Sequence, residues 1–288
     1  MDVHELMRDP RVAAAVAAAL AEDVGTGDAT TLALVDPAVM ATGEILAREA
    51  CRVSGAGVGK MVLERVDPFL QVEIVVPDGQ AVAKGDTILT IRGKAASILV
   101  AERTALNFMQ RMCGIATLTG RFVDAVSAYG TMILDTRKTT PGLRVFEKYA
   151  VRCGGGTNHR FGLYDRVLIK DNHRRLWQGG DPDRLDLAVE ASRRAFPALA
   201  VEVEVESVAE CVSALRGRPE WVMLDNMSCG MMRECVALCK GISKTEASGG
   251  ITLDRAREVA ATGVDAISLG CLTHSAPSVD LSLEWSVV

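Results

Sequence analysis

Short apolar runs alternate with segments of helical period over residues 131–273, and most of these runs end in ionisable or phosphate-binding residue types. We interpret the runs as buried strands. They lie at residues 132–134, 167–169, 201–205, 222–224 and 267–269, and residues 244–246 are a sixth strand candidate. Helical connectors are predicted at residues 182–196, 207–216, 228–240 and 252–262. A repeated β-then-α order with chemistry at the strand ends is typical of an α/β barrel, whose active site lies at the C-terminal ends of its strands.

The number of strands leaves two architectures open. Six strand candidates are present where a full barrel has eight, so either some strands are hidden or the barrel is irregular. An open doubly wound sheet is the structural alternative. The glycine fingerprint of dinucleotide-binding sheets is absent, because the glycines at residues 154–156 do not follow a strand with the required spacing.

The N-terminal third of the chain has a mixed α and β pattern. A proline opens a predicted helix at residues 10–22, and residues 102–112 also have helical period. Strand character appears at residues 43–53, 70–76 and 87–92. We therefore predict an α+β sandwich domain over residues 1–114 and a barrel domain over residues 115–274. The tail at residues 275–288 is expected to pack back on the first domain.

Composition and charge exclude several classes of partner. The chain is 49% hydrophobic and has a net charge of −5, which gives no reason to expect nucleic acid or a membrane as a partner. No apolar stretch approaches the roughly 18 residues needed to span a bilayer. The first residues lack the pattern of a signal peptide, so we expect a cytoplasmic protein. The eight cysteines are expected to be reduced thiols, with a zinc site near Cys235 and Cys239 as the alternative.

A set of basic residues is expected at or near the strand ends. It consists of Arg137, Lys138, His159, Arg160 and Lys170. Arginine suits carboxylates and phosphates because its planar guanidinium donates two parallel hydrogen bonds. Several cations that converge on one pocket repel one another, so they indicate an anion with multiple charges. The alternative is a solvated rim with scattered salt bridges.

Residues 201–206 alternate valine and glutamate, so their side chains point to opposite faces of the predicted strand. The valine face suits packing against helices, whereas the face with Glu204 would point into the barrel. Buried carboxylates need cations or a metal nearby, and Asp225 ends the next strand. Such oxygen ligands suit Mg²⁺ or ribose hydroxyls. The alternative is an edge strand with a solvated acidic face.

Two glycine-containing turns are candidates for a phosphate site. Ser248, Gly249 and Gly250 precede a predicted helix, and Gly270 ends the following strand. Glycines let backbone N–H groups approach an anion, and a helix N-terminus favours negative charge. In barrels, a phosphate site is often built from the loops that follow the last two strands.

Longer motifs resemble the quinolinate phosphoribosyltransferase family. They are ERTALN (102–107), DTRKTTPG (135–142), EKYA (147–150), GGGTNHR (154–160), IKDNH (169–173), EASGGI (246–251) and LTHS (272–275). Together with the loop at residues 22–30, they cover nearly the whole chain. Cys113 departs from the serine expected in many members, and a small residue there should not alter the chemistry.

The resemblance implies a transferase of NAD biosynthesis. Members transfer phosphoribose from phosphoribosyl pyrophosphate to the ring nitrogen of quinolinate, giving nicotinate mononucleotide, pyrophosphate and CO₂. The family fold is an N-terminal α+β sandwich domain and an irregular α/β barrel with fewer than eight strands, which agrees with six strand candidates. The resemblance also implies Mg²⁺ as the cofactor, and homodimers or larger homo-oligomers with shared active sites.

The resemblance also implies roles for individual residues. Arg103 matches an arginine supplied by a partner subunit. The family residues that hold quinolinate and pyrophosphate correspond here to Arg137, Lys138, His159, Arg160 and Lys170. The acids near the ribose and Mg²⁺ are matched by Glu204 and Asp225, as direct or indirect metal ligands. The 5-phosphate region is matched by Ser248, Gly249, Gly250 and Gly270. The expected catalytic residues are Lys138, Lys170, Glu204 and Asp225.

Three other functions remain alternatives. A related enzyme could use nicotinate, which has one carboxylate, but the number of cations favours a substrate with two. A ModD-like, molybdenum-associated relative would be expected to depart at residues 170–172 and around Asp135, and this chain keeps both. A non-enzymatic anion-binding protein would explain the cations but not the inward acids beside them.

Overall fold

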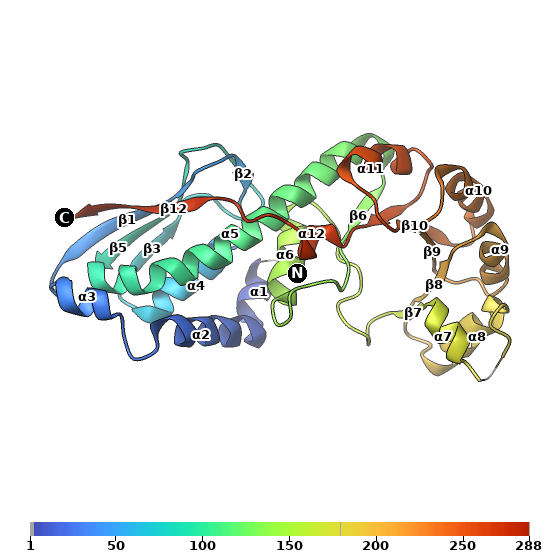
Figure 1. Cartoon of the computed structure of the whole chain (residues 1–288), viewed down its shortest axis with the longest axis horizontal. Helices are drawn as coiled ribbons and strands as arrows, with labels where there is room; N and C mark the ends of the chain where they lie inside the picture. The colour runs from blue at the N-terminus through green and yellow to red at the C-terminus, as the bar shows by residue number, and fades with distance from the viewer. Residues whose placement is uncertain (1–2, 179, 288) are drawn as a thin grey trace. The chain divides into compact units, whose positions relative to one another are not determined.

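The computed structural model describes residues 3–178 and 180–287, which form two compact units (Figure 1). Unit 1 comprises Met1–Gly120, Lys138–Gly156 and Cys271–Val288, and unit 2 comprises Arg121–Arg137 and Thr157–Gly270. Unit 1 is therefore assembled from three separate segments of the chain. No helix in the described part of the chain is both long and apolar enough to cross a membrane.

Unit 1 is built around an antiparallel sheet with the strand order β12-β1-β5-β3. Its strands are β1 (Met40–Ala47), β3 (Gln71–Ile74), β5 (Thr87–Lys94) and β12 (Leu281–Val287), with a separate pair of β2 (Cys51–Arg52) and β4 (Ala81–Val82). Its helices are α1 (Val3–Arg8), α2 (Pro10–Val24), α3 (Ala29–Leu34), α4 (Ala56–Val66), α6 (Arg144–Cys153), α12 (Cys271–His274) and most of α5 (Ala95–Val126). The C-terminal strand β12 pairs along nearly all of β1, from Ala41 opposite Val287 to Ala47 opposite Leu281.

Local sequence explains where the predicted N-terminal helix begins. Pro10 occupies the first turn of α2, where its missing N–H has no partner to lose. Asp9 caps the helix, because its side chain accepts a hydrogen bond from the backbone N–H of Arg11 at 2.9 Å. The buried residues of α2, Val12, Val16 and Leu20, recur at helical spacing and form its core face. The prediction of a helix over residues 10–22 is confirmed.

Helix α6 packs with unit 1, although it lies between two strands of unit 2 in the chain. Its residue Phe146 contacts Phe108 with ring centroids 5.1 Å apart, and the Tyr149 hydroxyl donates to Asp78 at 2.7 Å. An amphipathic pattern shows that a helix has an apolar face but not which core covers it. The compact units therefore follow a different division from the predicted domains 1–114 and 115–274, which stay a prediction.

Unit 2 contains a parallel sheet that has, within the described residues, six strands in the order β6-β11-β10-β9-β8-β7. The strands are β6 (Met132–Leu134), β7 (Val167–Ile169), β8 (Val201–Val205), β9 (Trp221–Asp225), β10 (Lys244–Ser248) and β11 (Ala266–Ser268). The helical elements are η1 (Ser127–Tyr129), α7 (Asp171–Leu176), α8 (Leu185–Ala195), α9 (Val208–Arg216), α10 (Cys229–Cys239) and α11 (Leu253–Ala260). Each of the six predicted strands is present.

The strand order distinguishes the two predicted architectures. Strands β7 to β11 are neighbours in chain order, and β6 pairs with β11. In a doubly wound sheet the strand order reverses at one point, whereas in a barrel the strands follow one another in cyclic order. The order seen here is cyclic, with the break between β6 and β7. The prediction of an irregular α/β barrel with fewer than eight strands, together with an α+β domain, is confirmed.

All eight cysteines, which lie in the described part of the chain, are free thiols. Cys211 and Cys239 approach to 3.7 Å between their sulfur atoms, and both are buried between α9 and α10. Cys211 and Cys239 therefore pack as small apolar side chains in the core, as expected from the sequence.

Candidate active site

Strand β8 places two glutamates in the interior of unit 2. Glu202 is fully buried and Glu204 is 9% exposed, whereas Glu206, beyond the strand, is exposed. The strand pairs with β7 on one side and with β9 on the other. The predicted inward acidic face is confirmed for Glu202 and Glu204, and the alternative of a solvated edge strand is wrong.

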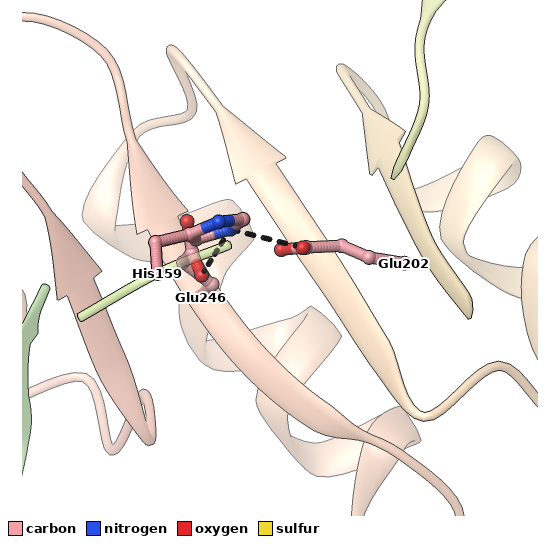
Figure 2. A group of neighbouring side chains, drawn as sticks. All are labelled: His159, Glu202 and Glu246. Atoms are coloured by element: carbon pink, nitrogen blue, oxygen red, sulfur yellow. Dashed lines mark ion pairs between the residues drawn. The ribbon is translucent and has the colours of Figure 1, made fainter. Parts of the chain in front are cut away.

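A histidine and two glutamates form a buried cluster inside unit 2 (Figure 2). Nε2 of His159 lies 3.0 Å from Oε2 of Glu202 and 3.5 Å from Oε2 of Glu246. Glu202 comes from β8 and Glu246 from β10, the two strands that flank β9. The ligand atoms of the three side chains lie within 4.8 Å of one another, a spacing that suits a metal ion.

The hydrogen bond to the other ring nitrogen argues against a metal at this cluster. The backbone N–H of Arg160 donates to Nδ1 of His159 at 2.7 Å. Because Nδ1 acts as an acceptor, the ring proton lies on Nε2, which then has no lone pair to offer a metal. We interpret the cluster as a group that shares protons, in which the Nε2–H of His159 faces the carboxylates of Glu202 and Glu246.

Asp135, the first residue after β6, fixes the backbone that carries His159. It is fully buried, and its Oδ1 accepts a hydrogen bond from the backbone N–H of His159 at 2.8 Å. Its Oδ2 accepts from the side-chain amide of Asn158 at 2.6 Å. The strand end of β6 therefore sets the position of the histidine by two hydrogen bonds to one carboxylate.

The two glutamates of the cluster differ in charge. Burial raises the pKa of Glu246 well above its ordinary value, and repulsion by Glu202 acts in the same direction. Burial alone would also raise the pKa of Glu202, but contacts with His159 and the positive charge of Arg166 outweigh it and lower that pKa. The environment therefore favours the charged form at Glu202 and the neutral form at Glu246.

Replacing Glu246 with glutamine is expected to make the protein gain stability relative to the parent as pH rises. The folded state holds the Glu246 proton above the pH at which the unfolded chain releases it, so the stability contributed by this group is lost with rising pH. Glutamine is neutral at every pH. The difference in free energy of unfolding should grow by up to about 1.4 kcal/mol per pH unit, measured by urea denaturation at about pH 5 and about pH 8.

Glu64→Gln is the matched control, because Glu64 is an exposed carboxylate in an ion pair with Lys60. This variant makes the same exchange of a carboxylate for an amide and leaves the buried cluster intact, so it controls for the exchange itself. Parallel stability curves for the parent and the Glu246→Gln variant would contradict a raised pKa of Glu246.

The cations predicted in unit 2 lie beside these acids. Lys170 directly follows β7 and forms an ion pair with Glu204. Its backbone N–H donates to Nδ1 of His173 at 3.0 Å, which fixes Lys170 at the start of α7. Burial, followed by repulsion from Arg137, lowers the pKa of the Arg160 guanidinium. Arg137 and Arg160 are therefore close enough to repel each other, a situation that a bound anion relieves.

Asp225 lies on the same face of the sheet as Glu204. Glu204 pairs with Met223, two residues before Asp225, and side chains two apart share a face. Oδ2 of Asp225 accepts a hydrogen bond from the side chain of Asn226 at 2.8 Å. Two carboxylates from neighbouring strands thus lie toward the C-terminal ends of β8 and β9, and their oxygens are the donors that Mg²⁺ prefers.

The glycine turn after β10 has a backbone that other residues would disturb. Gly249 has a φ of 98°, and a Cβ at this position would lie 2.1 Å from Oδ1 of Asn226. Gly250 has a φ of 56° and open space where a Cβ would be. Ser248 pairs with Asp225, and Gly270 directly follows β11. The turn therefore exposes backbone next to the candidate acids, as a phosphate site requires.

Two predicted site residues belong to unit 1. Arg103 is exposed on α5, and Lys138 is the exposed first residue of the segment that joins unit 1. Lys138 follows Arg137 of unit 2 directly in the chain. The remaining predicted site residues all belong to unit 2.

Two residues of this site were not identified from the sequence. Glu246 lies two residues before Ser248 on β10, and the same two-residue alternation that predicted inward glutamates on β8 would have identified it. Arg166 precedes β7, and its Nη1 lies 3.1 Å from Oε2 of Glu202. Its guanidinium also lies 5.5 Å from the ring centroid of Trp221. No local pattern indicates Arg166, because both contacts are with distant segments.

Comparisons with known proteins agree with this geometry. The family model for the N-terminal domain of quinolinate phosphoribosyl transferase matches residues 28–113, and the model for its C-terminal domain matches residues 115–284. The chain is 42% identical to quinolinate phosphoribosyltransferase [decarboxylating] 1 of Nicotiana glauca, over 92% of this chain and 80% of that protein. It is 40% identical to a probable nicotinate-nucleotide pyrophosphorylase [carboxylating] of Bacillus subtilis, over 91% and 89%. The solved nicotinate-nucleotide pyrophosphorylase of Francisella tularensis superposes with a TM-score of 0.90 and 38% identity, covering 96% of each chain.

Proposed function

The chain belongs to the quinolinate phosphoribosyltransferase family, and on that premise we propose that it transfers phosphoribose from phosphoribosyl pyrophosphate to quinolinate with loss of CO₂. The products are nicotinate mononucleotide, pyrophosphate and CO₂. The observation that best supports this activity is a set of cations beside buried acids at the strand ends of one parallel sheet. The ion pair between Lys170 and Glu204 is the most direct example of a cation beside a buried acid.

The cations suit substrates that carry many negative charges. Quinolinate is a dianion at neutral pH, and phosphoribosyl pyrophosphate adds several more charges. Arg137 and Arg160 repel each other, so a carboxylate between them removes an unfavourable interaction as well as forming hydrogen bonds. We assign quinolinate to these arginines, and the pyrophosphate to Lys138 and Lys170. His159, whose two ring nitrogens face protein atoms, would support the quinolinate position through the neighbouring Arg160.

The acids suit the transfer step. As the bond from the anomeric carbon to pyrophosphate breaks, positive charge develops on the ribose ring. Carboxylates at Glu204 and Asp225 stabilise that charge because they are already oriented when it appears. The same two oxygen-donor residues would hold Mg²⁺, directly or through water, and the ion would neutralise charge on the leaving pyrophosphate. Ser248, Gly249, Gly250 and Gly270 are assigned to the 5-phosphate.

Decarboxylation needs less from the protein than transfer does. Once the ring nitrogen of quinolinate is bonded to ribose, the ring is cationic and accepts an electron pair. The carboxylate next to the nitrogen leaves as CO₂, its bonding pair stays on the ring carbon, and that carbon then takes up a proton. The protein has to orient the ring, which the arginine contacts accomplish.

The activity is tested by mixing the protein with quinolinate, phosphoribosyl pyrophosphate and Mg²⁺. One nicotinate mononucleotide, one pyrophosphate and one CO₂ should form for each quinolinate consumed. Omitting Mg²⁺, or adding a chelator, should suppress the reaction. Binding of both substrates without any product would instead support an anion-binding protein.

We further propose that the enzyme works as a homodimer or larger homo-oligomer in which Arg103 completes the site of a partner subunit. Arg103 is exposed on α5 and belongs to unit 1, whereas most of the predicted site belongs to unit 2. An exposed arginine on a rigid helix can reach an anion in a second copy of the chain. A cytoplasmic location is in line with eight free thiols, since such thiols persist in a reducing compartment.

Mixing inactive Arg103→Ala chains with inactive Lys138→Ala chains is expected to restore part of the activity. In a mixed dimer, one of the two sites receives Arg103 from one chain and Lys138 from the other, so that site is intact. Random exchange makes half of the dimers mixed, each with one working site, so recovery should approach about a quarter of the parent activity. Subunit exchange must be confirmed separately, for example with differently tagged chains. Exchange without recovery would assign Arg103 to the site of its own chain.

A further inference from the structure

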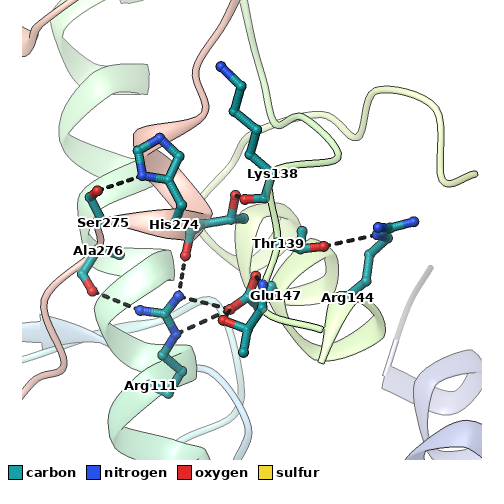
Figure 3. A network of polar contacts seen from close by, with 10 residues as sticks. Arg111, Lys138, Thr139, Arg144, Glu147, His274, Ser275 and Ala276 are labelled. Carbon is teal, nitrogen blue, oxygen red and sulfur yellow. Dashed lines mark hydrogen bonds and ion pairs between the residues drawn. The ribbon is translucent and has the colours of Figure 1, made fainter. Parts of the chain in front are cut away.

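The backbone of the short segment that begins at Lys138 is held from two sides (Figure 3). On one side, the hydroxyl of Thr273 on α12 donates to the carbonyl oxygen of Lys138 at 2.8 Å. On the other side, Glu147 on α6 accepts two hydrogen bonds from Thr140. The backbone N–H of Thr140 donates to Oε2 at 3.1 Å, and its hydroxyl donates to Oε1 at 2.8 Å. Both ends of residues 138–140 are therefore tied to helices.

Arg111 on α5 connects the two anchors. Its Nη2 lies 2.8 Å from Oε1 of Glu147 and also donates to the carbonyl oxygen of Thr273. Its Nη1 donates to the carbonyl oxygen of Ala276 at 2.9 Å. One guanidinium thus bonds to both Glu147 and Thr273, the two residues that hold residues 138–140. We call the pair of Arg111 and Glu147 the brace.

The brace depends on the charges of both members. The side chain of Glu147 is 1% exposed, so its carboxylate is stable there only because Arg111 and Thr140 supply donors. The planar fork of Arg111 reaches Glu147 and two carbonyl oxygens at once, which a lysine ammonium on a flexible stem would hold less firmly. The brace therefore specifies one backbone position for residues 138–140.

The side chain of Lys138 extends away from the brace (Figure 3). The position of the Lys138 backbone therefore determines which positions its ammonium group can reach. The next residue is held as well, because Nε of Arg144 donates to the hydroxyl of Thr139 at 2.9 Å. A shift of this backbone would move the ammonium without changing any residue that contacts a substrate.

We propose that Arg111 and Glu147 are positioning residues that place Lys138 for contact with the leaving pyrophosphate. This inference rests on the proposed function, in which Lys138 binds that group. Neither member of the brace is expected to touch a substrate. Misplacing a catalytic group by about 1 Å can lower the rate by about 10²-fold. The loss should appear in kcat and in pyrophosphate binding, while KM for quinolinate stays nearly unchanged.

The test is a double-mutant cycle between Glu147→Gln and Lys138→Ala. Glutamine keeps the shape of Glu147 but cannot accept both hydrogen bonds from Thr140 and pair with Arg111. Affinity for inorganic pyrophosphate with Mg²⁺ is measured by calorimetry, and kcat is measured alongside. Glu147→Gln should weaken pyrophosphate binding by about tenfold or more in the parent and have no further effect when Lys138 is already alanine. Equal losses in both backgrounds would overturn the proposal.

Glu220→Gln is the matched control for loss of such a carboxylate. Glu220 also accepts a backbone N–H, from Val201 at 2.7 Å, and also pairs with an arginine, Arg193 at 2.8 Å. It lies at the N-terminal end of β9, away from the predicted site residues, so this variant should keep the parent kcat. A loss of kcat equal to that of Glu147→Gln would assign the effect to general destabilisation and overturn the proposal.

Thr273→Val provides an independent variant if Glu147→Gln does not fold. It removes the hydroxyl that holds the Lys138 carbonyl and keeps the size of the side chain. It should also lower kcat and lose its effect in the Lys138→Ala background, and normal kcat would overturn the proposal. The pyrophosphate cycle does not require turnover. An inactive parent protein would therefore contradict the proposed function, while the cycle would still decide whether the brace acts through Lys138.

Discussion

Replacing Lys170 with alanine is expected to abolish measurable turnover while the fold survives. Lys170 follows β7 and pairs with Glu204, so its ammonium lies among the acids of the candidate site. The variant loses a charge-assisted contact with the substrate, which contributes about 1.5–3 kcal/mol. It also leaves the largely buried Glu204 carboxylate without its cation, at a cost of about 1–3 kcal/mol. The lost substrate contact alone corresponds to a decrease of about one to two powers of ten in kcat/KM, and to a larger decrease if the contact is stronger in the transition state, whereas the cost at Glu204 falls on stability.

The measurement is steady-state kinetics of the variant, with its thermal unfolding recorded in parallel. Side-chain exposure of 42% at Lys170 indicates that the fold does not depend on this residue, so the melting temperature should move by only a few degrees. Lys244→Ala is the matched control. Lys244 is an exposed lysine at the start of β10, and its ammonium lies 5.3 Å from the ring centroid of Trp221. Full activity of a folded Lys170→Ala variant would remove Lys170 from the site.

Quinolinate is expected to be preferred over nicotinate by about 10⁴-fold in kcat/KM, because a site built to pair a polar group rejects analogues that lack it. Quinolinate and nicotinate have one carboxylate position in common, so discrimination must come from the second carboxylate of quinolinate, next to the ring nitrogen. Without it, donors on Arg137 and Arg160 lose an acceptor, and their mutual repulsion has no counter-charge. Each unpaired buried donor costs about 1–3 kcal/mol.

The experiment supplies each acid with phosphoribosyl pyrophosphate and Mg²⁺, and follows mononucleotide and CO₂ separately. Arg160→Gln should lower turnover of quinolinate much more than turnover of nicotinate. The ratio of kcat/KM for quinolinate to kcat/KM for nicotinate should therefore fall in that variant. Comparable turnover of nicotinate by the parent protein would contradict the assignment of the arginines. Mononucleotide formed from quinolinate without CO₂ would contradict decarboxylation.

The order of elements and the inward acids could be predicted from the sequence because both depend on local periodicity. Alternation with a period of two places Glu202 and Glu204 on one face whatever the rest of the chain does. The apolar runs that end at Ile169 and Leu224 likewise identify strand ends, where the functional residues of parallel strands lie. These parts of the candidate site required no knowledge of tertiary contacts.

The remaining features depend on contacts between distant residues, which no local pattern specifies. The proton on Nε2 of His159 follows from a hydrogen bond that only the folded backbone forms. The raised pKa of Glu246 follows from burial beside Glu202, on a strand that is not adjacent to its own. The packing of α6 with unit 1 depends on which core covers its apolar face, and periodicity does not contain that information.

The pairing of β12 with β1 has a consequence for how the chain is made. Strand β12 (Leu281–Val287) is added to the sheet beside Met40–Ala47, so this sheet cannot be completed until residues 281–287 have left the ribosome. The segment Thr157–Gly270, by contrast, is synthesised earlier and contains five of the six strands of its own sheet. Nascent unit 1 therefore waits with an uncovered β1 edge, which is a surface that chaperones and aggregating chains bind.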